Sequence, residues 1–363
     1  MSYAGTNKGG TSAILAAEAL LRERRAASAG IPAADVYAAM PELVDQVMGE
    51  GGLWAPEVAA RAVLQAAGDT AEAVHLLRSH RSTLPRLAFT EPVDPDAMQL
   101  CRRVIPAHRQ PDGPQLLGAT FDYSPRLISE AGADPLGAEM LLDGWETPSP
   151  EHEDRPVQRF TQWLRDRDLL IDHRGSEDDE PYDLTLHPIS LPAPRSAVLS
   201  AMTNAETGAL VNAWYRGVTG PDGHTDESIT LGDVRHGHLD IQVTHPHTGR
   251  AVTVGQIDAT DAEAVAHLDS RGEDTSRFEA GYGFALGHNE RKAIAMSAMD
   301  LATTRFGATP EGERLEQVLM HTTDGLAANG FLEHLKLPHY VMFRSQVDRA
   351  QAAASEKKGR TES

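Results

Sequence analysis

The 363-residue sequence contains a single cysteine, Cys101. One cysteine excludes a disulfide within the chain, and it excludes an iron–sulfur cluster or a thiolate metal site built by this chain alone. A run of about 18 apolar residues, long enough to span a membrane, is lacking too. The N-terminal stretch MSYAGTNKGGTSA has neither the basic region nor the apolar run of a signal peptide. We therefore expect a cytoplasmic protein, in which any cluster chemistry is supplied by another subunit.

Basic residues are scarce: 33 Lys and Arg face 53 Asp and Glu, for a net charge of -20. This charge repels nucleic acid phosphates and anionic membranes, so we expect neither as a partner. Lysine is rarer than arginine and occurs only at positions 8, 292, 336, 357 and 358. The last two fall in a polar tail. Lys8, Lys292 and Lys336 therefore mark places where a compact ammonium is preferred to a guanidinium fork.

The first part of the chain has helical periodicity. TSAILAAEALLRERR, APEVAARAVLQAAG and DTAEAVHLLRSHRSTL carry apolar residues at helical spacing, with Thr, Pro, Gly or Asp at their boundaries. We predict a helical N-terminal domain over 1–125. The next segment, 126–195, is rich in Pro, Gly and acids and is interpreted as a variable linker or insertion with one helix in PVQRFTQWLRDRDLL.

The pattern changes to that of a sheet in 196–354. The helix-like PRSAVLSAMTNAETG comes first. The stretch ALVNAWYRGVTG is grouped with the sheet that follows, and the alternating apolar residues of HLDIQVTHPHTGRAVTVGQI predict a hairpin. FEAGYGFALG predicts another strand, HNERKAIAMSAMDLATTRF a helix, and 311–329 and 340–354 a final helix pair before a disordered tail, 355–363. The predicted fold class is α+β, with helices first and then a mainly antiparallel sheet with helices.

The stretch GYGFALGHNERKAIAMS, 281–297, leads from a strand into a helix. Backbone N–H groups at Gly281 and Gly283, together with Arg291 and Lys292, are suited to an anionic group such as phosphate. The motif is neither a Walker loop nor the dinucleotide fingerprint, because its glycine spacing differs from both. The alternative is a plain strand-to-helix turn with exposed cations, which spacing alone favours.

The stretch GPQLLGATFDYSPR, 113–126, mixes turn glycines with Asp122, Tyr123 and Arg126. Loops on a rigid scaffold carry many binding groups, which favours a site-lining segment. Asp and Tyr in turns also make local hydrogen bonds, so a structural role is equally compatible with this composition.

Histidines offer two metal hypotheses. His236 with His238, and His245 with His247, are H-x-H pairs on or beside strands, a spacing that suits zinc. The second pair falls in the hairpin tip, where solvent-facing histidines are expected instead.

The second hypothesis concerns FLEHLKLPHYVMF, 331–343, where His334 and His339 flank Pro338. Proline forces a turn there, which lets both rings converge on one metal ion. Two imidazoles are half of a tetrahedral zinc shell, so water, substrate or another chain would complete it. A helix-entry turn with surface histidines is the alternative.

Four stretches, in order along the chain, resemble the PhnI family, a subunit of the bacterial carbon–phosphorus lyase core complex. They are EGGLWAPEVAARAVLQAAGDTAEAVHLLRSHRSTLPRLAFTEP, GPQLLGATFDYSPRL, GYGFALGHNERKAIAM and GFLEHLKLPHYVMF. The resemblance runs from the first helix to near residue 350 and is weakest between about 130 and 195.

The resemblance implies a specific activity. With companion subunits, such proteins displace adenine from ATP with methylphosphonate, giving alpha-D-ribose 1-methylphosphonate 5-triphosphate, and alone they act as nucleosidases. It implies a radical-SAM partner among the other core subunits, and zinc at their shared interface held by His334 and His339. Mg²⁺ is expected with the triphosphate. H-x-H pairs are not part of the family pattern, which favours the non-ligand interpretation of His236 to His247.

Cleavage of an N-glycosidic bond needs a group that stabilises an oxocarbenium-like centre, a proton route to the purine, and donors for the triphosphate. By residue type, Asp122 is the candidate for the sugar cation or the nucleophile, and Tyr123 for orientation. The substrate-binding candidates are Arg126, Gly281, Gly283, Arg291 and Lys292. The alternative function is a non-catalytic scaffold that completes the radical-SAM partner's active site through the zinc-binding histidine motif.

Overall fold

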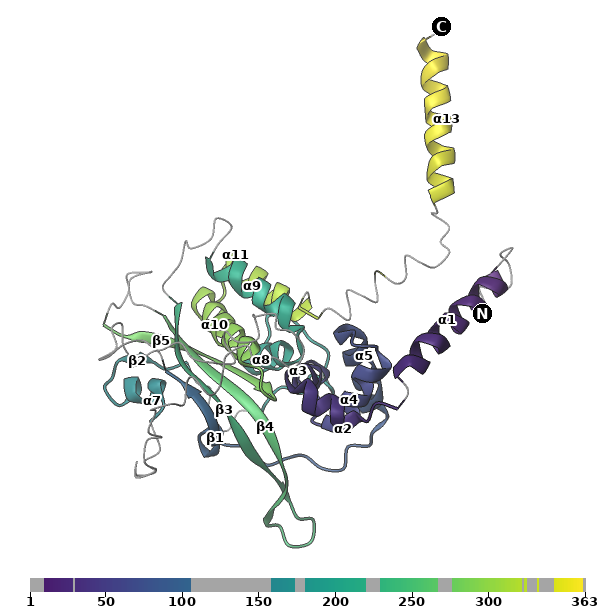
Figure 1. Ribbon diagram of the computed structural model, residues 1–363. Coiled ribbons are helices and arrows are strands. Elements are labelled where there is room, and N and C mark those ends of the chain that lie inside the picture. Colours follow the sequence, from purple (N-terminus) through teal and green to yellow (C-terminus); the bar gives the residue numbers. More distant parts are fainter. Residues whose placement is uncertain are drawn as a thin grey trace, which may run out of the picture.

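The computed structural model describes residues 10–28, 30–105, 158–173, 180–219, 229–266, 276–321, 323–324, 332 and 343–361. Most helices and a single twisted sheet pack into one body, and α1 and α13 project away from it (Figure 1).

The first five helices are α1 (Gly10–Ser28), α2 (Ala33–Ala39), α3 (Pro41–Gly51), α4 (Pro56–Gln65) and α5 (Thr70–Thr83). Local chemistry sets their ends. Proline occupies the first turn of α3 and of α4, where its missing N–H costs no helical hydrogen bond. Asp69 caps α5 by accepting from the backbone N–H of Glu72 at 3.0 Å. Apolar side chains of α2 to α5, among them Val44, Met48 and Leu77, form a separate core cluster.

The sheet contains β1 (Gln99–Val104), β2 (Leu170–Ile171), β3 (Ile229–Thr244), β4 (Ala251–Ala266) and β5 (Phe278–Leu286), in the order β1-β3-β4-β5-β2. All neighbouring pairs are antiparallel except β2 with β5. The predicted hairpin is confirmed: β3 and β4 pair along their length, and 245–250 form the tip. The predicted strand in FEAGYGFALG is confirmed as β5.

The remaining helices are α7 (Phe160–Arg165), α8 (Arg195–Asn204), α9 (Thr207–Thr219), α10 (Glu290–Phe306), α11 (Pro310–His321) and α13 (Phe343–Thr361), with a 3₁₀ turn η2 at Pro95–Ala97. Helix α10 lies along one face of the sheet (Figure 1). Small side chains such as Ala262, Ala264 and Ala298 pack between them. Strand alternation sends Asp261 and Glu263 of β4 to the opposite face.

The predicted mixture of helices with a mainly antiparallel sheet is confirmed, whereas the domain boundaries remain predictions. Two local differences stand out. The stretch 209–220, which was predicted as part of the sheet, belongs largely to α9. Helix α13 continues to Thr361, where the sequence predicted a disordered tail from 355. Among the described residues, no helix is long and apolar enough to cross a membrane.

Candidate functional site

The glycines of the GYGF motif lie where β5 meets α10. A Cβ atom at Gly283 would lie 2.8 Å from Met296 Cβ and Ser297 N, and closer still to the carbonyl oxygen of Ala293. A Cβ at Gly281 would lie 2.6 Å from the backbone nitrogen of Leu301. Both glycines therefore let the strand approach the helix backbone. Their role in substrate binding stays a prediction, although Gly281 also lines a cavity described below.

The two cations of the motif occupy different environments. Arg291 is exposed on α10, whereas Lys292 is completely buried and its Nζ donates to the carbonyl oxygen of Ala205 at 2.8 Å. Burial lowers the pKa of Lys292 from 10.5 to about 7. A compact ammonium fits this enclosed place, as the scarcity of lysine suggested. Phosphate binding by either side chain stays a prediction.

Burial of Lys292 predicts an unusual dependence of stability on pH. Between pH 7 and 10.5 the unfolded chain binds a proton on this lysine more tightly than the folded chain, so folding is increasingly disfavoured as the pH falls. Relative to Lys292→Met, the wild-type free energy of unfolding should rise with pH by up to about 1.4 kcal/mol per unit, and the difference should level off below pH 7. Urea unfolding across this range measures it. Lys357→Met on exposed α13 is the control, and the same pH dependence in both variants would contradict the prediction.

A group of histidines and acids gathers where β3 meets the start of α10. The rings of His236 and His288 stack with centroids 4.4 Å apart. Burial, and then the neighbouring His288, lower the pKa of His236. His288 Nε2 lies 3.4 Å from Glu290 Oε1, which also accepts from Arg102 Nε at 2.7 Å. This His288 cluster therefore holds titratable groups in close contact.

Asp45 of α3 lies beside the His288 cluster. Its Oδ2 accepts from the backbone N–H of His288 at 2.8 Å. Its Oδ1, and Nδ2 of Asn289, are buried without a hydrogen-bond partner among the described residues. Burial raises the pKa of Asp45. Unpaired buried polar atoms are uncommon, and groups with shifted pKa values are enriched at functional sites, so this cluster is a secondary candidate for chemistry.

Within the described part of the chain, no group of three or more His, Cys, Asp or Glu is arranged to hold a metal ion. His238 instead contacts Asp258 at 2.5 Å and Cys101 Sγ at 3.3 Å. At the hairpin tip His245 Nδ1 accepts from the backbone N–H of His247, whose own side chain is exposed as predicted.

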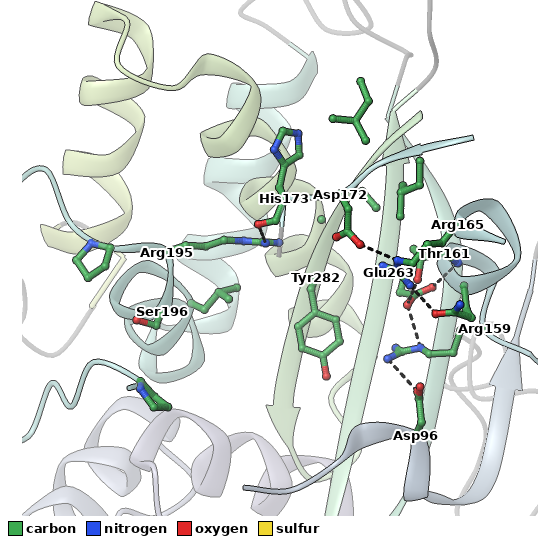
Figure 2. A pocket seen from close by; sticks show the side chains of 18 of the residues that line it. Asp96, Arg159, Thr161, Arg165, Asp172, His173, Arg195, Ser196, Glu263 and Tyr282 are labelled. Atoms are coloured by element: carbon green, nitrogen blue, oxygen red, sulfur yellow. Dashed lines mark hydrogen bonds and ion pairs between the residues drawn. The ribbon is translucent and has the colours of Figure 1, made fainter. Parts of the chain in front are cut away.

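A cavity of about 780 Å³ lies on the sheet face opposite α10, between α7, the chain after β2, and α8 (Figure 2). Its size falls in the range of small-molecule sites. Arginine, carboxylate and phenol groups from six separate parts of the chain line it: Asp96, Arg159, Arg165, Asp172, Arg195, Glu263 and Tyr282. The fold, rather than any short motif, brings them together.

The carboxylates of β4 are fixed by cations and donors. Glu263 accepts from Thr161 N at 3.1 Å and from Thr161 Oγ1 at 2.6 Å. Arg159 Nε lies 2.9 Å from Glu263 Oε1 without hydrogen-bond alignment, and Arg159 Nη2 donates to Asp261 at 2.9 Å. Arg235 donates to both Asp261 oxygens at 3.0 and 2.7 Å. Each side chain therefore has one fixed orientation.

Tyr282 and Arg195 complete the lining. Burial, and then Asp261, raise the pKa of Tyr282, so its phenol stays neutral and donates to Asp261 Oδ2 at 3.3 Å. Arg195 donates to both oxygens of buried Asp300, at 2.8 and 2.5 Å, yet its side chain remains 32% exposed toward the cavity. Figure 2 shows Tyr282 between the Arg195 side and the Glu263 side.

Such a cavity supplies three chemical abilities. Guanidinium groups can bind anionic oxygens, an oriented carboxylate can stabilise a positive charge, and a neutral phenol can take part in hydrogen bonds or proton transfer. The described residues thus provide a site for a charged, polar small molecule.

Five predicted site residues lie outside the described residues: Asp122, Tyr123, Arg126, His334 and His339. Gly281 is the predicted site residue that lines the cavity, whereas its charged and phenolic groups were not predicted. One signal was available for β4, where DATDAEAVA places Asp261 and Glu263 two apart on an otherwise small, apolar strand. Tyr282 lies inside the GYGF motif itself.

Comparison with known proteins gives consistent matches over almost the whole chain. The family model described as "Bacterial phosphonate metabolism protein (PhnI)" matches residues 4–357. A putative C-P lyase subunit protein HtxH from Stutzerimonas stutzeri is 36% identical over 365 residues, covering 94% of this chain and 93% of the relative. Alpha-D-ribose 1-methylphosphonate 5-triphosphate synthase subunits PhnI from Rhizobium meliloti (strain 1021) and Escherichia coli (strain K12) are each 36% identical over 352 residues, with 94% of this chain and 92% and 95% of the relatives covered.

Proposed function

Because this chain belongs to the PhnI family of bacterial phosphonate metabolism proteins, we propose that it is a subunit of an alpha-D-ribose 1-methylphosphonate 5-triphosphate synthase. The relatives carry that name, and one is named as a C-P lyase subunit. In the proposed reaction, methylphosphonate displaces adenine from the ribose of ATP. When the chain is isolated, water takes the place of the phosphonate and free adenine is released slowly.

The observation that carries the proposal is the convergence of arginines, carboxylates and a neutral phenol in the cavity of Figure 2. Methylphosphonate and a triphosphate are both anions, and Arg165 and Arg195 present guanidinium groups to them. Glu263 faces the sugar C1, where positive charge develops as the base departs. In the proposed complex the Tyr282 O–H exchanges its hydrogen bond to Asp261 Oδ2 for one to a purine nitrogen, and the purine leaves more readily when that nitrogen is hydrogen-bonded.

Mg²⁺ accompanies the triphosphate in this proposal. Carboxylate oxygens are its preferred protein ligands, and Asp96 and Asp172 are partly exposed carboxylates that line the cavity. Held by these carboxylates, Mg²⁺ would neutralise phosphate charge and reduce the repulsion between the triphosphate and the acidic lining. The earlier substrate roles of Asp122, Tyr123 and Arg126 are retained as parts of the same proposal.

The alternative function assigns the chemistry to a partner. In it, His334 and His339 bind zinc at the interface with a radical-SAM subunit, and this chain acts as the scaffold that completes that subunit's site. The single-cysteine composition supports such sharing, because a partner must provide any thiolate ligands. Zinc would then bind tightly in the complex and weakly to the isolated chain.

Release of free base by the isolated chain distinguishes the two functions. We expect the purified, isolated chain to release adenine from ATP in the presence of Mg²⁺, detected by chromatography as a product that increases linearly with time and with protein concentration. A complex that converts ATP and methylphosphonate, combined with an isolated chain that releases no base, would favour the scaffold. Metal analysis of wild-type and His334→Ala/His339→Ala complexes, run beside the assay, separates loss of zinc from loss of base release.

A further inference from the structure

A second groove, of about 820 Å³, lies between the C-terminal end of α5, α8, α11 and the segments 84–86 and 184–189. It shares no lining residue with the cavity of Figure 2. Three arginines line it, and its other walls are largely apolar, including Leu53, Leu184, Ile189 and Leu319.

Two of the three arginines are neutralised by acids. Arg78 donates to both oxygens of Asp324, at 3.0 and 2.9 Å. Its Nε and Nη2 atoms donate to the backbone carbonyl oxygens of Glu50 and Asn204. Arg86 donates to Asp183 at 2.9 Å. Hydrogen bonds, first from Thr185 and also from Arg86, lower the pKa of Asp183 to about 2, so this partner stays charged.

Arg81 differs from both neighbours. Its guanidinium makes one hydrogen bond among the described residues, to the carbonyl oxygen of Gly52 at 3.2 Å, and no described carboxylate pairs with it. Burial, followed by repulsion from Arg78 and Arg86, lowers the pKa of its guanidinium. In a chain of net charge -20, a partly buried cation that no described carboxylate compensates would be stabilised by a bound anion.

The position of Arg81 is also set in advance. Gly52 ends α3 with φ 64°, and a Cβ atom there would meet Arg81 Nη1. Because Gly52 has no side chain, the Arg81 guanidinium can occupy this space at the groove wall. A planar guanidinium held in one place suits two oxygens of a phosphoryl group better than it suits a point charge.

We propose that this groove binds a small molecule in which a phosphoryl or phosphonyl group is attached to an apolar or aromatic body, with Arg81 as the main contact to the anion. The apolar wall accommodates the body, and Arg81 binds the oxygens. The site is additional to the proposed synthase function, because its residues are distinct and its test is binding without turnover.

Phenylphosphonate is a suitable probe, because its ring tests the apolar wall and its carbon–phosphorus bond resists hydrolysis. We expect calorimetric binding to the wild-type chain, and about tenfold or greater weakening in Arg81→Gln, the usual effect of losing a charge-assisted hydrogen bond. Arg61→Gln, exposed on α4, is the matched control and should bind as wild type does. Methylphosphonate and inorganic phosphate should bind more weakly, because they lack the ring.

Three results would overturn the proposal. The first is no binding of phenylphosphonate to the folded wild-type chain. The second is equal affinity in Arg81→Gln, with folding verified by its thermal transition. The third is equal affinity for benzoate, which carries a carboxylate on the same ring and would show that the groove does not select a phosphoryl-type anion. Base release from ATP is measured separately, so loss of one activity does not imply loss of the other.

Discussion

The variant Glu263→Gln should lower the turnover number for base release from ATP by about 10²–10³-fold, with a much smaller change in the Michaelis constant. The substitution keeps the size of the side chain and removes its negative charge. Glu263 is held by Thr161 and Arg159, so its charge is oriented before substrate binds. In the proposed reaction this charge lies opposite the sugar C1, and it matters most when positive charge develops there, which is in the transition state.

Two controls make this result specific. Glu57→Gln, an exposed acid on α4, removes the same charge elsewhere and should leave turnover unchanged. Thermal unfolding of Glu263→Gln separates a catalytic loss from a folding defect, because Glu263 also pairs with Arg159. Unchanged turnover in a folded Glu263→Gln chain would show that another carboxylate faces the sugar, and Asp122→Asn would then be the variant to test.

The elements that the sequence predicted share one physical property. The β3–β4 hairpin, β5 and α10 have apolar periodicities set by burial on one side, and periodicity is a local property of sequence. Helix α9 was grouped with the sheet because ALVNAWYRGVTG is short and largely apolar, so its periodicity does not distinguish a helix from a strand. The packing of α9 against α10 decides it instead.

The candidate site was harder to predict, because it depends on long-range contacts. Arg159 and Asp261 are 102 residues apart in the sequence and form an ion pair at 2.9 Å. Nothing in the residues around Arg159 indicates this partner. Lys292 was predicted in part. The scarcity of lysine in the sequence drew attention to this position, but its complete burial follows from the packing of α10 against neighbouring elements.

Glycine motifs present the same ambiguity in its sharpest form. A glycine before a helix can allow the close approach of a phosphate or of another backbone segment. Both roles require glycine, so the sequence alone does not distinguish them. The geometry at Gly283 supplies the second reason, since α10 occupies the space of a side chain. Substitution can establish whether the first reason holds as well.

Gly283→Ala should lower the free energy of unfolding by at least about 2–3 kcal/mol, because its methyl group would overlap the backbone of α10 and force β5 and α10 apart. Gly255→Ala is the matched control: it also lies in a strand, in β4, and has no atom within 4 Å of the added Cβ. That variant should be neutral or slightly stabilising, since alanine loses less backbone entropy than glycine on folding. Urea unfolding of both variants measures the difference. The opposite result would be a Gly283→Ala chain of wild-type stability with a raised Michaelis constant for ATP. It would show that α10 tolerates the methyl group and that the methyl group interferes with substrate, so Gly283 would be assigned to substrate binding instead.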